Sequence, residues 1–152
     1  MLSRIATIVP CAETVSLPSV FDRFREIDRA SYEHASIDPP AALVALAAGV
    51  TERALRPVAA RVIRLAPGDY LLAHHDHSHD DHRVELILDL SPAVVPDAEV
   101  RYRRDGAVFF RFPSQPGAAS IVERDPATQC YHTYVSKLHR GAVVLRLVLL
   151  LV

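Results

Sequence analysis

Residues 70–83 of the chain read YLLAHHDHSHDDHR and lie between two β-like runs. This stretch holds five of the eight histidines in the sequence. Neutral imidazoles and ionised carboxylates are the usual protein ligands of first-row metals. His74 and Asp76 form an H-x-D pair, and residues two apart on an extended chain point to the same face. The stretch therefore predicts a metal site at the end of a β-strand.

The histidine stretch allows more than one ligand pair. His75 and His77 form an H-x-H pair that is the rival of His74 and Asp76. Because neighbouring strand residues point to opposite faces, only one of the two pairs can face a common site. We favour His74 with Asp76, and we expect His77, His79 and His82 to form a mobile lip. The simplest alternative for the whole stretch is a solvated polar loop.

Length and composition set limits on the kind of protein. The chain has 152 residues, 50% of them hydrophobic, and eleven prolines, which predicts one globular, turn-rich domain over residues 1–152. The net charge of −1 offers no field that would attract nucleic acid. Cys11 and Cys130 are too few for a disulfide framework, so we expect a reduced, cytoplasmic setting. No apolar run is long enough for a signal or membrane-spanning segment, so we expect no membrane partner.

The pattern of short runs predicts a mainly β fold. After Pro57, eight β-like runs alternate with Pro, Gly and Asp turns, at about 58–65, 69–75, 83–90, 99–104, 107–112, 118–123, 129–136 and 142–152. Many short strands of this kind favour an antiparallel double-stranded β-helix, or jelly roll, with a concave mouth for a small ligand.

Two supporting helices are expected before this core, within residues 19–56. Ser19 would cap the first, in which Phe21, Phe24 and Ile27 recur at helical spacing. Asp38 would cap the second, which Pro57 would stop near Arg56. The β core would then occupy residues 58–152.

Several segments resemble the iron(II)/2-oxoglutarate-dependent dioxygenases, especially the prolyl-hydroxylase-like branch. RLAPGDYLLAHHDH (64–77) is similar to the strand that leads into the H-x-D motif, and RVELILDLSP (83–92) is similar to the next core strand. FRFPSQPGAASIVERDPATQCYHTYV (110–135) resembles the Pro–Gly turn and the strand that carries a distal histidine, here His132. The final strand carries Arg146, where the family has a basic residue. The resemblance covers roughly residues 61–150.

The resemblance implies a cofactor system and a set of site residues. Iron(II) would be held by His74, Asp76 and His132, and 2-oxoglutarate would be the co-substrate, bound by Arg146 and by Tyr70. Ascorbate would serve as a reductant. Because Asp76 is retained, the implied reaction is hydroxylation of a small molecule, an amino acid or a peptide residue, with release of succinate and carbon dioxide.

His132 and Arg146 each have a second interpretation. His132 can be a core histidine bonded to the backbone. Arg146 interrupts GAVVLRLVLLLV (141–152), which is otherwise apolar on both alternating faces, so its charge needs a partner. That partner is either a protein carboxylate, such as Glu85 or Asp89, or the distal carboxylate of 2-oxoglutarate.

Three further alternatives stay open. Arg146 lies 14 residues after His132, a longer spacing than in the commonest family pattern, and Arg140 is the next candidate for the co-substrate. A non-catalytic protein that binds nickel or zinc through HHDHSHDDH (74–82) would need neither His132 nor Arg146. A cupin-like metalloprotein would use a similar jelly roll without a buried arginine.

Overall fold

The computed structural model describes residues 4–72 and 83–152. His74, His75, Asp76, His77, His79 and His82, with the predictions made for them, therefore lie outside the described residues. Within the described part, one sheet of eleven strands runs in the order β1-β9-β6-β11-β4-β3-β5-β10-β7-β8, with β2 paired to β3. The strands are β1 (Ala6–Pro10), β2 (Asp22–Glu26), β3 (Ala30–Ser36), β4 (Pro57–Leu65), β5 (Tyr70–Leu71), β6 (Val84–Asp89), β7 (Val100–Arg104), β8 (Ala107–Phe112), β9 (Ala118–Glu123), β10 (Gln129–His132) and β11 (Val144–Leu151).

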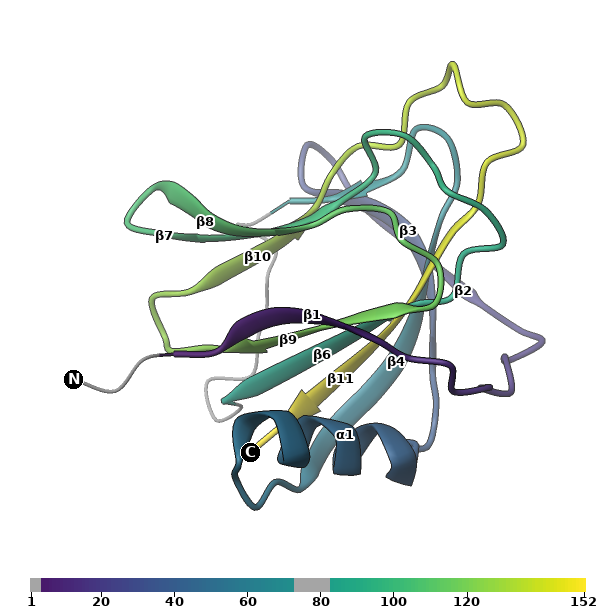
Figure 1. The fold of residues 1–152 in the computed structure, drawn as a ribbon. Coiled ribbons are helices and arrows are strands. Elements are labelled where there is room, and N and C mark those ends of the chain that lie inside the picture. Colours follow the sequence, from purple (N-terminus) through teal and green to yellow (C-terminus); the bar gives the residue numbers. More distant parts are fainter. Residues whose placement is uncertain (1–3, 73–82) are drawn as a thin grey trace.

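The sheet folds over into two facing layers (Figure 1). Strands β1, β9, β6, β11 and β4 form the lower layer in that view, and β10, β7 and β8 form the upper one. All pairings along the sheet are antiparallel. This is the predicted mainly β, jelly-roll fold, and each of the eight predicted runs overlaps one of the strands β4 to β11.

Strand β11 lies within the lower layer, between β6 and β4, and is buried on both faces. Val144 and Val148 belong to the apolar cluster between the layers, together with Ile63 of β4 and Ile87 of β6. The alternate residues of β11 belong to a second cluster on the outer face of the layer, under helix α1 (Ala41–Thr51). The even-numbered residues of β11, Arg146 among them, thus face the interior of the barrel.

The first predicted helix is wrong, because residues 22–36 form the β2–β3 hairpin. Phe24 lies directly opposite Tyr32 in the register, and their ring centroids are 5.6 Å apart. Asp28 adopts a left-handed conformation in the turn (φ 61°), and the amide of Arg29 donates to the carbonyl of Glu26. Cross-strand aromatic packing outweighs the apolar spacing that resembled a helix.

The second predicted helix is confirmed, with different ends. Helix α1 begins after Pro40, which is its N-cap without a side-chain bond, so Asp38 is not the cap. It stops at Thr51, and Glu52 takes a left-handed conformation (φ 54°). Arg56 exchanges both backbone hydrogen bonds with Val152, at 2.9 and 3.0 Å, which a helix extending to Arg56 would prevent. Among the described residues no helix is both long and apolar enough to cross a membrane.

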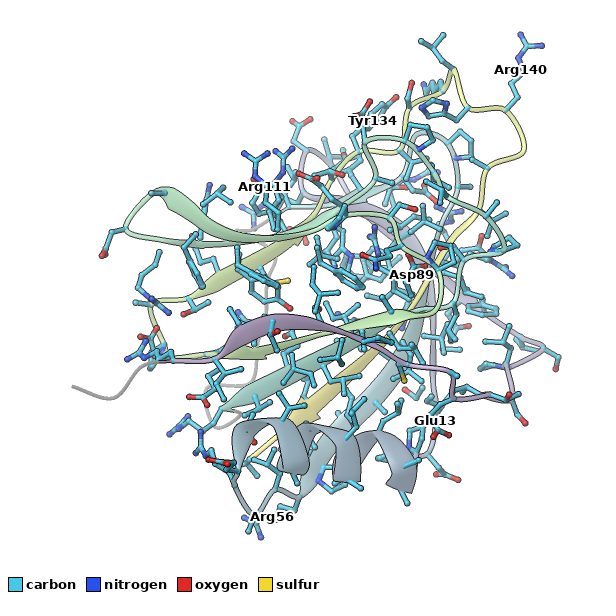
Figure 2. All side chains as sticks on the ribbon, viewed as in Figure 1. Glu13, Arg56, Asp89, Arg111, Tyr134 and Arg140 are labelled. Carbon is cyan, nitrogen blue, oxygen red and sulfur yellow. The ribbon has the colours of Figure 1, made fainter. Side chains whose placement is uncertain are left out.

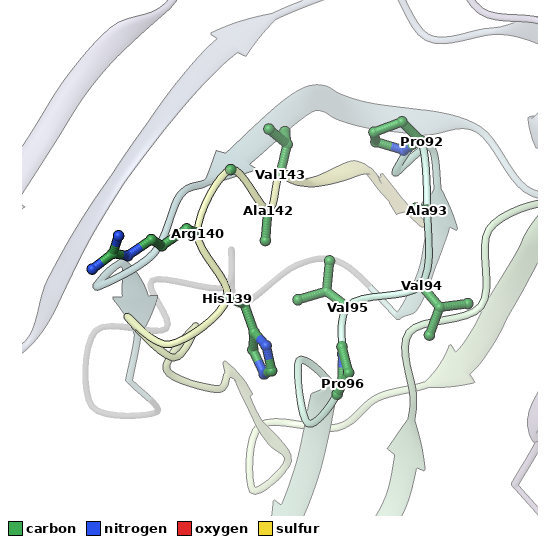
Figure 3. A pocket seen from close by; sticks show the side chains of 10 residues that line it. Pro92, Ala93, Val94, Val95, Pro96, His139, Arg140, Ala142 and Val143 are labelled. Atoms are coloured by element: carbon green, nitrogen blue, oxygen red, sulfur yellow. The ribbon is translucent and has the colours of Figure 1, made fainter.

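Two loops at one end of the barrel enclose a surface cleft of about 320 Å³ (Figure 3). Residues 92–96 form one wall and residues 139–143 the other. The walls are mostly apolar, and the Arg140 side chain is exposed and points away from the cleft. Arg140, the alternative to Arg146, therefore lies on the surface and not in the interior of the barrel.

Candidate functional site

The structure brings together two of the predicted site residues, His132 and Arg146. His132 is the last residue of β10 and lies in register with Leu71 and Val100 on its neighbouring strands. Arg146 is the third residue of β11, in register with Ile63 and Asp89. The two side chains meet between the layers, where Nη1 of Arg146 lies 3.0 Å from Nδ1 of His132.

Burial sets the charge state of this pair. His132 is 3% exposed and Arg146 is 2% exposed. Burial, together with the charge of Arg146, holds the pKa of His132 well below its ordinary value, so the imidazole is neutral. Burial also lowers the pKa of Arg146 to about 10, against the opposing effect of Asp89, so the guanidinium keeps its charge at pH 7. A guanidinium only donates hydrogen bonds, so Nδ1 of His132 is the acceptor.

Neither expected carboxylate forms an ion pair with Arg146. Asp89 lies opposite Arg146 and between the layers (Figure 2). Its two oxygens accept the amides of Ser91 at 2.9 Å and Gln115 at 2.8 Å, so it ties two loops together. Within residues 4–72 and 83–152, the hydrogen bond to His132 is the one polar contact of the guanidinium. The described residues therefore provide no carboxylate partner for the charge of Arg146.

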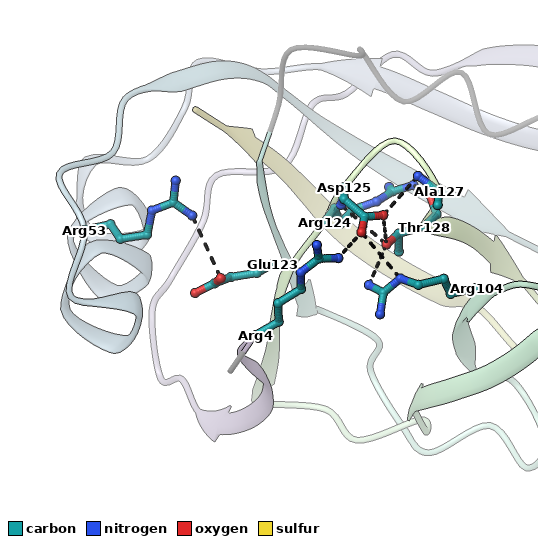
Figure 4. A network of polar contacts seen from close by, with 8 residues as sticks. All are labelled: Arg4, Arg53, Arg104, Glu123, Arg124, Asp125, Ala127 and Thr128. Carbon is teal, nitrogen blue, oxygen red and sulfur yellow. Dashed lines mark hydrogen bonds and ion pairs between the residues drawn. The ribbon is translucent and has the colours of Figure 1, made fainter. Parts of the chain in front are cut away.

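Glu85 is the centre of a second buried polar group in the interior. Its Oε1 accepts the hydroxyl of Tyr102 at 2.6 Å, and its Oε2 accepts Nη1 of Arg124 at 2.6 Å. Arg124 also donates to the carbonyl of Thr128 at 2.9 Å, and Thr128 bonds Asp125 and Arg104 near the surface (Figure 4). Glu85 is close enough for its charge to raise the pKa of His132, against the larger effect of burial. The network fixes a carboxylate on the inner wall of the barrel.

Tyr102→Phe should lower the free energy of unfolding by about 1.5–3 kcal/mol, because it removes a hydrogen bond to a buried charge. Burial raises the pKa of Tyr102, so its hydroxyl stays a donor across the accessible pH range. Urea unfolding of the two proteins measures the difference. Tyr134→Phe is the control, since the Tyr134 side chain is half-exposed and packs against the ring of Tyr70, and it should change stability by less than about 0.5 kcal/mol. Equal losses in the two variants would contradict the assignment.

Tyr70 is placed apart from the His132–Arg146 pair. Leu71 is buried and shares the inner face with His132, so Tyr70 points to the outer face. There its ring centroid lies 6.3 Å from that of Tyr134, a half-exposed side chain. The contact of Tyr70 with a ligand stays a prediction that this geometry does not favour.

The metal site itself is not tested by the described residues. Residues 4–72 and 83–152 contain no group of three or more His, Cys, Asp or Glu side chains that could hold an ion. Strand β5 ends at Leu71, directly opposite His132, and the chain then enters the H-x-D stretch. The described part of the chain thus supplies one neutral imidazole next to the strand that leads to His74 and Asp76.

Sequence reasoning missed the roles of Tyr102 and Arg124. Both face the interior, Tyr102 opposite Cys130 on β10 and Arg124 just after β9. The alternation of Val100, Tyr102 and Arg104 in β7 does place Tyr102 on the apolar face. Its partner, however, depends on which strands face each other across the barrel.

Comparison with known proteins gives a consistent picture of the fold. No family model and no curated protein matches the sequence. Among solved structures, an oxidoreductase of the 2OG-Fe(II) oxygenase family from Burkholderia pseudomallei is similar over 87% of this chain and 72% of that one, with a TM-score of 0.66 and 11% identity. A Pseudomonas putida prolyl-4-hydroxylase is similar over 85% and 76%, with a TM-score of 0.57 and 13% identity.

A third similar structure is the viral collagen prolyl hydroxylase from Paramecium bursaria Chlorella virus-1, in complex with 2OG. It has a TM-score of 0.57 and 14% identity, over 82% of this chain and 81% of that one. The chain therefore has the fold of these 2OG-Fe(II) oxygenases.

Proposed function

We propose that the protein is an iron(II)- and 2-oxoglutarate-dependent oxygenase that hydroxylates a small molecule, an amino acid or a peptide residue. The fold it shares with three such oxygenases supports this class. A fold alone does not determine chemistry, so the argument depends on the residues inside the barrel.

The observation that carries the proposal is the state of Arg146. A charged guanidinium lies buried in the interior, in contact with a neutral imidazole and with no carboxylate in ion-pair distance among the described residues. A buried charge without a counter-ion is costly, and guanidinium binds a carboxylate through two parallel hydrogen bonds. The distal carboxylate of 2-oxoglutarate would supply the missing anion.

His132 fits the role of a metal ligand because burial keeps its imidazole neutral. His74 and Asp76 would complete the two-histidine, one-carboxylate set. Iron(II) with 2-oxoglutarate would use dioxygen as the oxidant, with one oxygen atom going to succinate as carbon dioxide is released and the other to the hydroxylated substrate; ascorbate would keep the iron reduced.

The hydrogen bond between the pair also has a consequence for binding. With Nδ1 accepting from Arg146, the proton of the neutral ring is on Nε2. Ligation through Nε2 would move that proton to Nδ1, where a second donor is unfavourable. His132 as a ligand therefore requires Arg146 to turn away, which makes its guanidinium available to a carboxylate.

An anaerobic titration with iron(II) and 2-oxoglutarate tests the proposal. We expect the weak visible charge-transfer band of the chelate, at one iron per chain. Correctly folded protein without this band would remove the proposed function. Binding of several nickel or zinc ions per chain, without the band, would support the histidine-rich metal-binding alternative.

Turnover gives a second, independent measurement. With iron(II), ascorbate and oxygen, we expect slow conversion of 2-oxoglutarate to succinate even without the primary substrate. Asp76→Gly should suppress this conversion, because it removes the proposed carboxylate ligand. Succinate formation that continues in the variant would exclude Asp76 from the site.

A further inference from the structure

Ser120 places a hydroxyl group inside the barrel. It is a residue of β9, in register with Ile8 of β1 and Ile87 of β6, and it is completely buried. Its alternate neighbours on the strand, Ala118 and Val122, belong with Ile87 to the apolar cluster between the layers. Because these residues share one face of β9, the Ser120 side chain faces the interior.

The Ser120 hydroxyl has no hydrogen-bond partner, which separates it from other buried hydroxyl groups of the described chain. Ser31 bonds Asp69, Ser91 accepts the amide of Leu145 at 2.9 Å, and Thr51 donates to the carbonyl of Ala47 at 2.7 Å. In the described residues, one other buried side-chain atom lacks a hydrogen bond, Nε of Arg104, but it lies 3.6 Å from Oδ2 of Asp125 in an ion pair. A buried hydroxyl without a partner is destabilising, and such a group in a native structure calls for an explanation.

The position of Ser120 relates it to Arg146, which pairs with no carboxylate among the described residues. Ser120 is in register with Ile87, and Ile87 is in register with Val148 of β11. Val148 is the next residue after Arg146 on the inner face of β11. Arg146 and Ser120 therefore project from the same wall, two strands apart (about 10 Å) and one pleat step along the sheet (about 7 Å). Ser120 therefore lies on the part of the wall toward which a ligand bound by Arg146 would extend if it crossed β6.

We propose that Ser120 is a second hydrogen-bonding contact for the dicarboxylate that Arg146 binds. Its hydroxyl donates to an oxygen of the bound 2-oxoglutarate, and the partner that is lacking in the ligand-free protein is supplied by the ligand. This inference rests on the proposed function, because it takes the ligand from that proposal. The inference adds Ser120, on β9, to the candidate site. None of the site residues predicted from the sequence lies on that strand.

Ser120→Ala distinguishes a residue that contacts the ligand from a residue that only packs in the core. The two roles predict different changes in the melting temperature and in the Kd for 2-oxoglutarate. In the ligand-free protein the hydroxyl makes no bond, so its removal should raise the melting temperature by about 2–4 °C. In the complex it makes one, so the Kd for 2-oxoglutarate should rise about fivefold to tenfold. The measurements are thermal unfolding without ligand and calorimetric titration of 2-oxoglutarate into the manganese(II)-loaded protein without oxygen.

Ser31→Ala is the matched control, since Ser31 is also a buried strand serine but bonds Asp69 on the outer face, opposite the half-buried Tyr70. It should lower the melting temperature and leave the Kd within twofold. If Ser120→Ala leaves the Kd within twofold while the wild type binds, Ser120 is a packing residue and this inference is overturned, with the proposed function intact. A melting temperature that falls in Ser120→Ala overturns it as well, because the hydroxyl is then already bonded. A wild type that does not bind 2-oxoglutarate overturns both proposals.

Discussion

Arg146→Met is expected to weaken the binding of 2-oxoglutarate by about 2–5 kcal/mol, the range for truncating one partner of a buried hydrogen-bonded charge pair. Arg146→Lys keeps the charge but loses the two-pronged geometry, so it should cost about 1–3 kcal/mol. Iron affinity should stay nearly unchanged in Arg146→Lys and should not fall in Arg146→Met, which removes the donor to Nδ1 of His132. Calorimetric titrations of metal and of 2-oxoglutarate measure the two affinities separately.

The fold should tolerate the methionine. The described contact of the guanidinium is to His132, which is neutral, so an apolar side chain of similar length leaves no unpaired charge behind. Arg140→Met, on the exposed loop, is the control and should leave 2-oxoglutarate binding intact. If Arg146→Met unfolds the protein, or if both variants at position 146 bind 2-oxoglutarate normally, Arg146 is structural and Arg140 becomes the candidate.

His132→Ala should reduce iron(II) affinity by more than the roughly 10- to 100-fold that the loss of an outer hydrogen-bonding partner costs. The reason is that one of three protein ligands is lost. His74→Ala and Asp76→Ala should have effects of the same size. Metal titration monitored by competition with a chelator gives the affinities, and circular dichroism checks that each variant is folded.

His79→Ala and His82→Ala are the controls for the metal site. Both belong to the histidine stretch but not to the proposed ligand set, so each should leave iron affinity close to that of the wild type. A different result would favour the alternative function: affinity that falls with the number of stretch histidines removed, together with a silent His132→Ala, describes a metal-binding tract.

The β core could be predicted because its signals are local. Each strand from β4 to β11 coincides with a short apolar run between Pro, Gly or Asp turns, and β11 stands out as a strand apolar on both faces. The hairpin at residues 22–36 could not be predicted in the same way. Phe21, Phe24 and Ile27 fit helical spacing, yet Phe24 packs on Tyr32, and Ile27 is left 84% exposed in the turn. The hairpin is stabilised by contacts between β2 and β3, and the spacing of apolar residues within residues 21–27 does not reveal such contacts.

In the candidate site, too, features with a local sequence signal could be predicted, and features that depend on contacts between distant strands could not. Arg146 could be identified because a single charge in an apolar strand is visible in the sequence. Its possible protein partners, Glu85 and Asp89, are buried, but each is bonded to other groups. The link between Glu85 and Tyr102 joins strands of opposite layers, and the unpartnered state of Ser120 depends on everything around it. Such properties belong to the assembled barrel.

The two faces of β11 separate two kinds of mutational sensitivity within one strand. Leu147 and Leu149 pack in the cluster under α1, where truncation removes apolar contacts and lowers the amount of folded protein. Arg146 faces the interior, where a change of side chain alters what the barrel can hold. A library of single substitutions in β11, scored once for cellular abundance and once for ligand capture, would therefore separate Arg146 from its apolar neighbours: Val144, Leu147, Val148 and Leu149 should affect abundance, and Arg146 should affect ligand capture. The strand offers an engineer separate control of how well the protein folds and of what it binds.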